Sequence, residues 1–364
     1  MRTIFFNNGF IFGLIGFSVL FAACNSHQDT PSKPQTSKAP DFKNLQWAAQ
    51  TPATDANLRG LCVVSDRIVW ASGSKGTFLR TADGGKSWFS KTIEGTDSLD
   101  FRDIHAFDEN RAVVLSSGFP AHIYKTTDGG KTWQQTYFNE QEGVFFDGFD
   151  FANEKEGMAF SDPIDGKLFI IKTTDGGDSW QAIDTTHLPD VLTGEAGYAA
   201  SGTGIIFKDQ NIWIATGGGE RARVLHSEDS GTHWQVFDTP IVSAEGKGIF
   251  SMAMSDAQNG VVVGGAYMDS TNKVRNCAIT QDGGKNWELI ATQQPNGYRS
   301  CVASHATEQL LIAVGRTGSD ISEDKGKSWT SIGQEGYYSC GIAAKTAWAV
   351  GRSGKMAKMD FRLP

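Results

Sequence analysis

The sequence is poor in cysteine and in motifs that bind a cofactor. Its 364 residues include five cysteines. Four of them, Cys62, Cys277, Cys301 and Cys340, stand so far apart that they match no metal-binding pattern. The glycine-rich stretch TGGGE (216–220) lacks both the Lys-Ser/Thr of a P-loop and the spacing of a dinucleotide fingerprint. No flavin, nicotinamide or haem motif is present, so we expect neither a cofactor nor a metal.

Positive charge is also scarce. Lys and Arg number 33 against 41 Asp and Glu, which gives a formal net charge of −8. Nucleic-acid binding depends largely on neutralising phosphates with basic side chains. The composition therefore argues against a nucleic-acid partner.

Long apolar runs are confined to the N-terminus. Residues 1–23 carry one early positive charge, Arg2, then an apolar core and two alanines, which is typical of a secretory signal. Cys24 follows directly, as in the lipobox of bacterial lipoproteins, although that pattern prefers Leu where this chain has Phe21. We predict an exported protein, lipid-anchored through Cys24 on the periplasmic or outer-membrane face. An ordinary cleaved signal and a retained membrane anchor are the alternatives.

Residues 24–41 contain few apolar side chains and three prolines, so we expect a disordered tether. The folded domain is then expected to span 42–364.

Inside this domain, an eight-residue pattern typified by TTDGGKTW (126–133) recurs six times. Each copy holds an Asp and a Gly suited to a tight turn, followed by a Trp that buries a large surface. The six aspartates are Asp83, Asp128, Asp175, Asp229, Asp282 and Asp324.

Repeats of roughly 40–50 residues with short β-rich runs are typical of a β-propeller. We predict an all-β fold with seven four-stranded antiparallel blades. Residues 336–360 resemble the first three strands of a blade but lack the eight-residue pattern and the strand after it. NLQWAAQT (44–51) resembles such a fourth strand, with its own Trp47, but no three strands precede it. The N-terminal strand is therefore expected to close the seventh blade, which leaves no open sheet edge.

Arginines recur where the inner strands begin. GYRSCVA (297–303) and GYYSCGI (336–342) align without gaps and pair Arg299 with Tyr338 and Cys301 with Cys340. Two further arginines follow the second strands, in VGRTG (314–318) and VGRSG (350–354). Because arginine binds carboxylates and phosphates in a planar fork, we predict an anion site on one rim. Its residues are Arg59, Arg102, Asp147, Arg299, Arg316, Tyr338 and Arg352. The alternative is that each arginine pairs with a nearby acid.

The repeated sequence resembles the Asp-box, or BNR, repeat, whose aspartates are structural rather than catalytic. Over roughly residues 42–360 the chain looks like the photosystem II stability/assembly factor type of propeller. That resemblance implies a non-enzymatic, monomeric factor that binds a membrane protein, an acidic peptide or an anionic ligand. Relatives of this kind are sometimes labelled oxidoreductases, which no motif here supports.

Two other interpretations stay open. Asp-box propellers include sialidases and other glycoside hydrolases, although the Arg-Ile-Pro motif of sialidases is missing here. In a sialidase, Arg59, Arg102 and Arg299 would hold the substrate carboxylate. Tyr338 would be the nucleophile with Glu195 as its partner, and Asp147 would be the acid/base for cleavage of the glycosidic bond. The third interpretation is a surface lipoprotein that binds a glycan or a peptide without catalysis. The sequence leaves open whether Cys301 and Cys340 form a disulfide.

Overall fold

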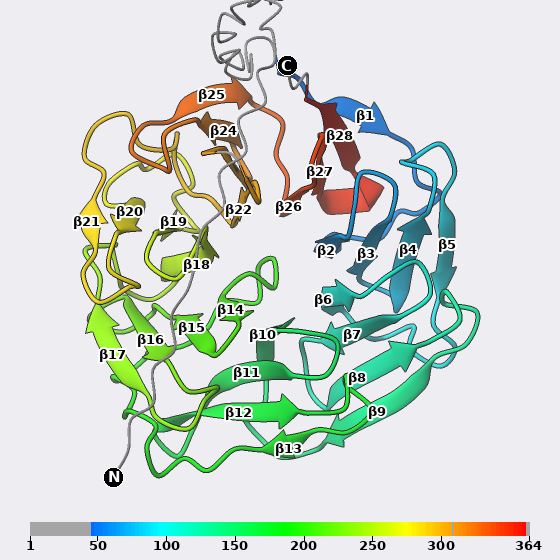
Figure 1. The fold of residues 1–364 in the computed structure, drawn as a ribbon, viewed down its shortest axis with the longest axis horizontal. Helices are drawn as coiled ribbons and strands as arrows, with labels where there is room; N and C mark the ends of the chain where they lie inside the picture. Colours follow the sequence, from blue (N-terminus) through cyan, green and yellow to red (C-terminus); the bar gives the residue numbers. More distant parts are fainter. Residues whose placement is uncertain (1–44, 308, 362–364) are drawn as a thin grey trace, which may run out of the picture. The chain divides into compact units, whose positions relative to one another are not determined.

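The protein is described by a computed structural model that covers residues 45–307 and 309–361. These residues form seven four-stranded antiparallel sheets arranged as blades around a ring (Figure 1). In blades one to six, four consecutive strands run from the centre of the ring outward. The predicted seven-bladed propeller is therefore confirmed. The signal segment, the tether and Cys24 lie outside the described residues.

The strands follow the chain in a regular order. Blade one consists of β2 (Leu58–Val63), β3 (Val69–Gly73), β4 (Thr77–Thr81) and β5 (Phe89–Thr92). Blade two consists of β6 (Phe101–Ala106), β7 (Ala112–Ser116), β8 (Ala121–Thr126) and β9 (Gln134–Asn139). Blade three consists of β10 (Phe146–Phe151), β11 (Gly157–Ile164), β12 (Lys167–Thr173) and β13 (Gln181–Ala182). Blade four consists of β14 (Ile205–Lys208), β15 (Asn211–Ala215), β16 (Arg223–Ser227) and β17 (Gln235–Asp238). Blade five consists of β18 (Lys247–Met254), β19 (Gly260–Ala266), β20 (Cys277–Thr280) and β21 (Glu288–Leu289). Blade six consists of β22 (Cys301–Ser304), β23 (Leu311–Gly315), β24 (Gly318–Ser322) and β25 (Thr330–Gly333).

Blade seven joins the two ends of the chain. It contains β26 (Ser339–Ile342), β27 (Thr346–Val350), the short 3-10 helix η1 (Arg352–Gly354) and β28 (Met356–Asp360), with β1 (Ala48–Gln50) as its outer strand. β1 pairs antiparallel with β28. Just before β1, Trp47 donates from Nε1 to Ser319 Oγ of blade six at 3.0 Å and packs on the Tyr337 ring at 5.6 Å. The predicted closure by the N-terminal strand is confirmed.

The Asp-box turns act as structural corners. In blade one, Thr81 Oγ1 donates to Asp83 Oδ1 at 2.8 Å and accepts the Gly85 N–H at 2.9 Å. Asp83 Oδ1 also accepts the Ser87 N–H at 3.0 Å. Gly85 has φ +87°, and a Cβ there would come within 2.5 Å of Trp348 in blade seven. The turn therefore needs glycine both for its backbone conformation and for close contact between blades.

A β-bulge interrupts several inner strands near their first residues. In blades one, two, three and five, one residue of the inner strand has no partner on the second strand. Such a residue redirects its side chain relative to a regular strand. The four unpaired residues are Arg59, Arg102, Asp147 and Phe250.

The segment before β14 crosses the middle of the ring. Ser201 Oγ donates to the Ser300 carbonyl of blade six at 2.9 Å, and Thr203 Oγ1 is bonded to Ser251 Oγ of blade five at 2.6 Å. On the opposite side, a Cβ on Gly202 would meet the Asp103 carboxyl group of blade two. Residues 199–203 therefore reach three separate blades and form a plug in the centre.

No helix among residues 45–307 and 309–361 has the length and apolarity needed to cross a membrane.

Cys62, Cys277, Cys301 and Cys340 are all free thiols. The Cys301 Sγ instead donates to the Cys340 carbonyl at 3.4 Å, and the Cys340 Sγ donates to the Ile312 carbonyl. In this structure Cys301 and Cys340 therefore form no disulfide.

Candidate functional site

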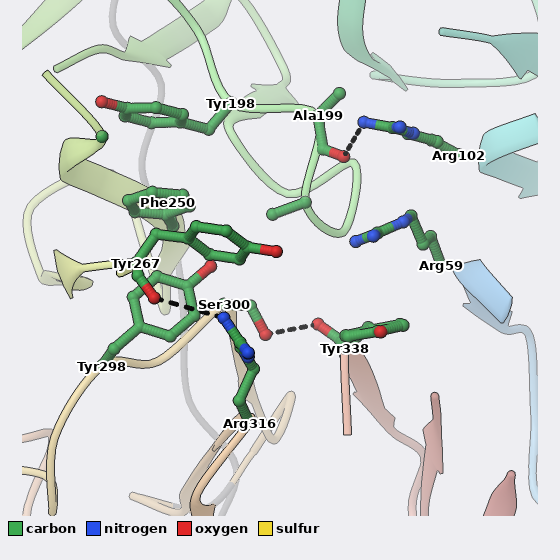
Figure 2. A pocket seen from close by; sticks show the side chains of 12 residues that line it. Arg59, Arg102, Tyr198, Ala199, Phe250, Tyr267, Tyr298, Ser300, Arg316 and Tyr338 are labelled. Atoms are coloured by element: carbon green, nitrogen blue, oxygen red, sulfur yellow. Dashed lines mark hydrogen bonds between the residues drawn. The ribbon is translucent and has the colours of Figure 1, made fainter. Parts of the chain in front are cut away.

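A cavity of about 310 Å³ lies beside the central plug, and Figure 2 shows the side chains around it. Guanidinium groups line one part of the cavity and aromatic rings line another. Most of the lining comes from inner-strand openings, the plug and the turns after second strands. The lining residues are Arg59, Arg102, Tyr198, Ala199, Ala200, Gly246, Phe250, Tyr267, Tyr298, Ser300, Arg316 and Tyr338.

Arg59 and Arg102 occupy equivalent bulge positions in neighbouring blades. The Arg59 guanidinium lies 4.3 Å from the centroid of the Tyr338 ring, a cation–π distance. Arg102 donates from Nε to Asp100 Oδ2 at 2.8 Å and from Nη1 to the Ala199 carbonyl at 3.5 Å. Arg102 is thus partly neutralised, whereas Arg59 forms no ion pair with any carboxylate in the described part of the chain.

Arg316 approaches from the turn between β23 and β24. Its guanidinium lies 4.9 Å from the centroid of the Tyr267 ring, and Nη1 donates to the Tyr267 carbonyl at 3.4 Å. The side chain is exposed and, within residues 45–307 and 309–361, has no carboxylate partner. The structure therefore brings together four of the predicted site residues: Arg59, Arg102, Arg316 and Tyr338.

Arg299 is not among them. Its side chain is 1 % exposed and forms a salt bridge inside blade six, where Nε donates to Asp320 Oδ2 at 2.6 Å. Nη1 donates to Thr317 Oγ1 at 3.1 Å. The expectation that Arg299 faces the rim is corrected, because this guanidinium is used internally to hold the β23–β24 turn.

The reason is a one-residue difference in strand pairing. Ser300 donates its N–H to the Val314 carbonyl, and Tyr338 donates its N–H to the Val350 carbonyl. Val314 and Val350 are equivalent, since each begins a Val-Gly-Arg turn. In the structure Tyr338 therefore corresponds to Ser300, whereas the gapless sequence alignment had paired it with Arg299. A shift of one residue turns a strand side chain to the opposite face.

Asp147 lies behind the cavity rather than in its lining. It is 2 % exposed, and its buried Oδ2 has no hydrogen-bond partner among the described residues. Burial and the Asp162 charge raise the pKa of Asp147 well above its ordinary value, although the nearby Arg102 opposes this. Asp162 in turn accepts the Gly197 N–H at 3.2 Å. The pair supports the segment that carries Tyr198 and Ala199.

The remaining predicted residue, Arg352, is exposed on η1 and does not line the cavity. Lys75, in the corresponding turn of blade one, pairs with Asp55 at 2.8 Å. Glu195, which the hydrolase interpretation used, is fully occupied by Arg223 and by Thr216 Oγ1 at 2.6 Å. Among the described residues, no group of three His, Cys, Asp or Glu side chains could hold a metal ion.

The aromatic part of the cavity was missed by the sequence reasoning. Tyr198 and Phe250 stack with centroids 3.9 Å apart, and Tyr298 meets Phe250 edge-on at 4.7 Å. Phe250 occupies the same bulge position as Arg59 and Arg102, so extending the register to blade five would have identified it. Tyr198 and Tyr267 come from non-repeated segments, which carry no periodic signal.

Comparisons with known proteins agree with the fold. The family model "Photosynthesis system II assembly factor YCF48" matches residues 39–144, fewer than a third of the chain. No curated protein matches. The structure titled "YCF48 bound to D1 peptide" is similar, with a TM-score of 0.62 and 17 % identity over 90 % of this chain and 98 % of that one.

Two further structures share the architecture. YCF48 from Cyanidioschyzon merolae has a TM-score of 0.61 and 17 % identity over 86 % of this chain and 99 % of its own. The GH74 enzyme of Niastella koreensis has a TM-score of 0.61 and 14 % identity, covering 86 % of this chain and 53 % of its own. The resemblance to the assembly-factor propellers is thus confirmed by a family-model match and a shared fold.

Proposed function

We propose that this protein is a non-catalytic binding propeller that captures an acidic segment of a protein partner at Arg59, Arg102 and Arg316. The observation that carries the proposal is the pair of guanidinium groups, Arg59 and Arg316, that line a cavity with no carboxylate partner among the described residues. Like charges brought together are unfavourable unless an anion joins them. An anionic ligand would remove that repulsion.

The comparisons support a peptide as the ligand. A propeller of the same fold is described as bound to a D1 peptide, which makes peptide capture a reasonable use of this architecture. For this chain we further propose export and lipid anchoring at Cys24, so that its partner is a membrane protein or a segment of one. We propose that it acts as a monomer.

The test is binding of a short fluorescent peptide rich in Asp and Glu, measured by anisotropy against the purified domain. We expect Arg59→Ala and Arg316→Ala each to weaken binding about tenfold or more, because charge-assisted hydrogen bonds contribute about 1.5–3 kcal/mol. Arg352→Ala is the matched control, since Arg352 occupies the blade-seven turn equivalent to that of Arg316 but lies outside the cavity lining. Equal affinity of wild type and Arg59→Ala would remove the proposal.

A glycoside hydrolase is the alternative class, and the GH74 enzyme shows that this fold can host one. Glycosidases act through a pair of carboxyl groups that flank the scissile bond. Asp147 is 2 % exposed and does not line the cavity, and Glu195 is held by Arg223. Turnover of a fluorogenic sialoside or glycoside panel that disappears in Asp147→Asn would favour the hydrolase instead. A glycan-binding lipoprotein would bind sugars without turnover.

A further inference from the structure

The aromatic part of the cavity brings together rings from three blades. Tyr198 directly precedes the plug and β14 of blade four, Phe250 and Tyr267 come from blade five, and Tyr298 comes from blade six. Tyr298 lies 5.7 Å from Tyr267 and 4.7 Å from Phe250 in edge-on contacts (Figure 2). The rings form a continuous apolar wall beside the arginines.

That wall continues onto the surface of the protein. Five large apolar side chains are exposed among the described residues: Phe119, Phe138, Tyr267, Met268 and Val274. Three of the five stand on the single segment between β19 and β20, with Met268 86 % and Val274 62 % exposed. Tyr267 belongs both to this segment and to the cavity lining. Exposed apolar side chains that gather beside a cavity mark an interaction surface.

Arg316 joins the charged and apolar parts. Its guanidinium stacks on Tyr267 at 4.9 Å, so a positive charge sits directly over an aromatic ring of the wall. A ligand that reaches Arg316 with a carboxylate therefore places its neighbouring group against Tyr267 and the rings behind it. The cavity volume of about 310 Å³ is at the small end for ligand pockets, and suits one or two side chains rather than a folded element.

We infer that the segment captured at this site carries an aromatic or large aliphatic side chain next to its acidic residue. The carboxylate binds Arg59 and Arg316, and the apolar side chain enters the wall of Tyr198, Phe250, Tyr267 and Tyr298. The occupant is a linear segment of a partner protein. This inference rests on the proposed function, because it assumes that the arginines hold an anion.

Three peptides of equal length test the inference by fluorescence anisotropy: one with a Phe flanked by Asp residues, one with that Phe replaced by Ala, and one with the Asp residues replaced by Asn. We expect the change of Phe to Ala to weaken binding about tenfold to a hundredfold, as for the burial of one large apolar side chain. The Asn peptide should lose most of its affinity.

The protein variant Tyr267→Ala supplies the second half of a double-mutant cycle. We expect it to reduce the preference for the Phe peptide over the Ala peptide, because the two groups are in contact. Phe138→Ala is the matched control, an exposed aromatic side chain of blade two that leaves the preference unchanged. A purely structural effect of Tyr267→Ala would weaken both peptides equally and would overturn the inference.

Two outcomes separate this inference from the proposed function. If the Phe and Ala peptides bind equally and both depend on Arg59, the inference is wrong and the proposed function stands. If neither acidic peptide binds, both fail. A third outcome is that the protein binds phosphatidylglycerol vesicles, loses this binding in Met268→Ser, and shows no selectivity among the peptides. That result would identify the exposed segment as a membrane contact and would contradict the inference.

Discussion

The guanidinium of Arg59 in blade one lies over the ring of Tyr338 in blade seven, 4.3 Å from its centroid. These are the two blades that the chain ends bring together, since blade seven is completed by β1. The candidate site therefore sits across the seam that closes the ring. Its geometry depends on a contact between residues about 280 positions apart in the chain.

We expect Tyr338→Leu to weaken binding of the acidic peptide several-fold. A cation–π contact contributes roughly 0.5–2 kcal/mol, and Leu removes the ring that orients Arg59. Tyr338→Phe keeps the ring face and should bind as the wild type does. The measurement is the peptide Kd by anisotropy, with circular dichroism to verify folding. A loss of the same size in both variants would show that the hydroxyl group, rather than the ring, matters.

Trp47→Ala should lower the free energy of unfolding by about 1–3 kcal/mol, because a half-buried aromatic side chain is removed from the closure. It loses both the hydrogen bond to Ser319 Oγ and the contact with Tyr337. Trp47→Phe keeps the ring contact and should lose about 0.5–1.5 kcal/mol. Urea denaturation measures both values. Met268→Ala, on the exposed segment, is the control and should change stability by less than about 0.5 kcal/mol. Unchanged stability in Trp47→Ala would contradict the closure.

Stability should fall as the pH rises from 5 to 8, with Asp147 as one cause. Burial and the Asp162 charge raise its pKa in the folded state, so the folded protein keeps a proton that the unfolded chain releases above about pH 4. Asp147→Asn cannot ionise and should make the fall in stability with rising pH shallower. Urea denaturation at both pH values provides the measurement.

The control for this pH experiment is Asp55→Asn. Lys75 lowers the pKa of Asp55, so Asp55 is ionised throughout that range in both states and contributes no slope. An identical pH dependence in the wild type and in Asp147→Asn would show that Asp147 is ionised in the folded protein.

Lipid anchoring predicts that Cys24→Ala loses fatty-acid labelling in cells fed with radioactive palmitate. The variant should also lose its retention in the membrane pellet. Cys62→Ala should keep the label, because Cys62 lies within the inner strand β2 of the propeller. Membrane retention of Cys24→Ala without label would instead indicate that the signal segment remains as an anchor.

The repeat architecture could be predicted from the sequence because the hydrogen bonds that form each Asp-box turn join residues close together in the chain. Thr81, Asp83, Gly85 and Ser87 close their own turn through side-chain and backbone hydrogen bonds that span only two to four residues. Six such turns, each followed by a Trp, define blade boundaries without any knowledge of the rest of the molecule. The C-terminal unit lacks a fourth strand and the N-terminus has one extra strand, so the two ends together make up a seventh blade.

The composition of the site was predicted only in part. Arg59 and Arg102 were found because they repeat at one position of the inner strand, and that position proved to be the bulge that redirects a side chain. Arg299 was misplaced because blades six and seven differ by one residue in pairing, although their sequences align without a gap. The hydrogen-bond register of a strand is set by its pairing with the neighbouring strand, so it cannot be determined from the amino-acid sequence of one strand alone.

The amino-acid sequence by itself determined the number of blades, the turns between their outer strands and the closure of the ring, because short-range hydrogen bonds and a regularly repeated Trp specify these features. Only the tertiary structure decided which aromatic side chains join the predicted arginines in the cavity. Tyr198, Phe250 and Tyr298 come from three blades, and Arg59 meets Tyr338 across the closing seam. Such contacts arise only once the blades are in place, since no local interaction encodes the distance between residues on different blades.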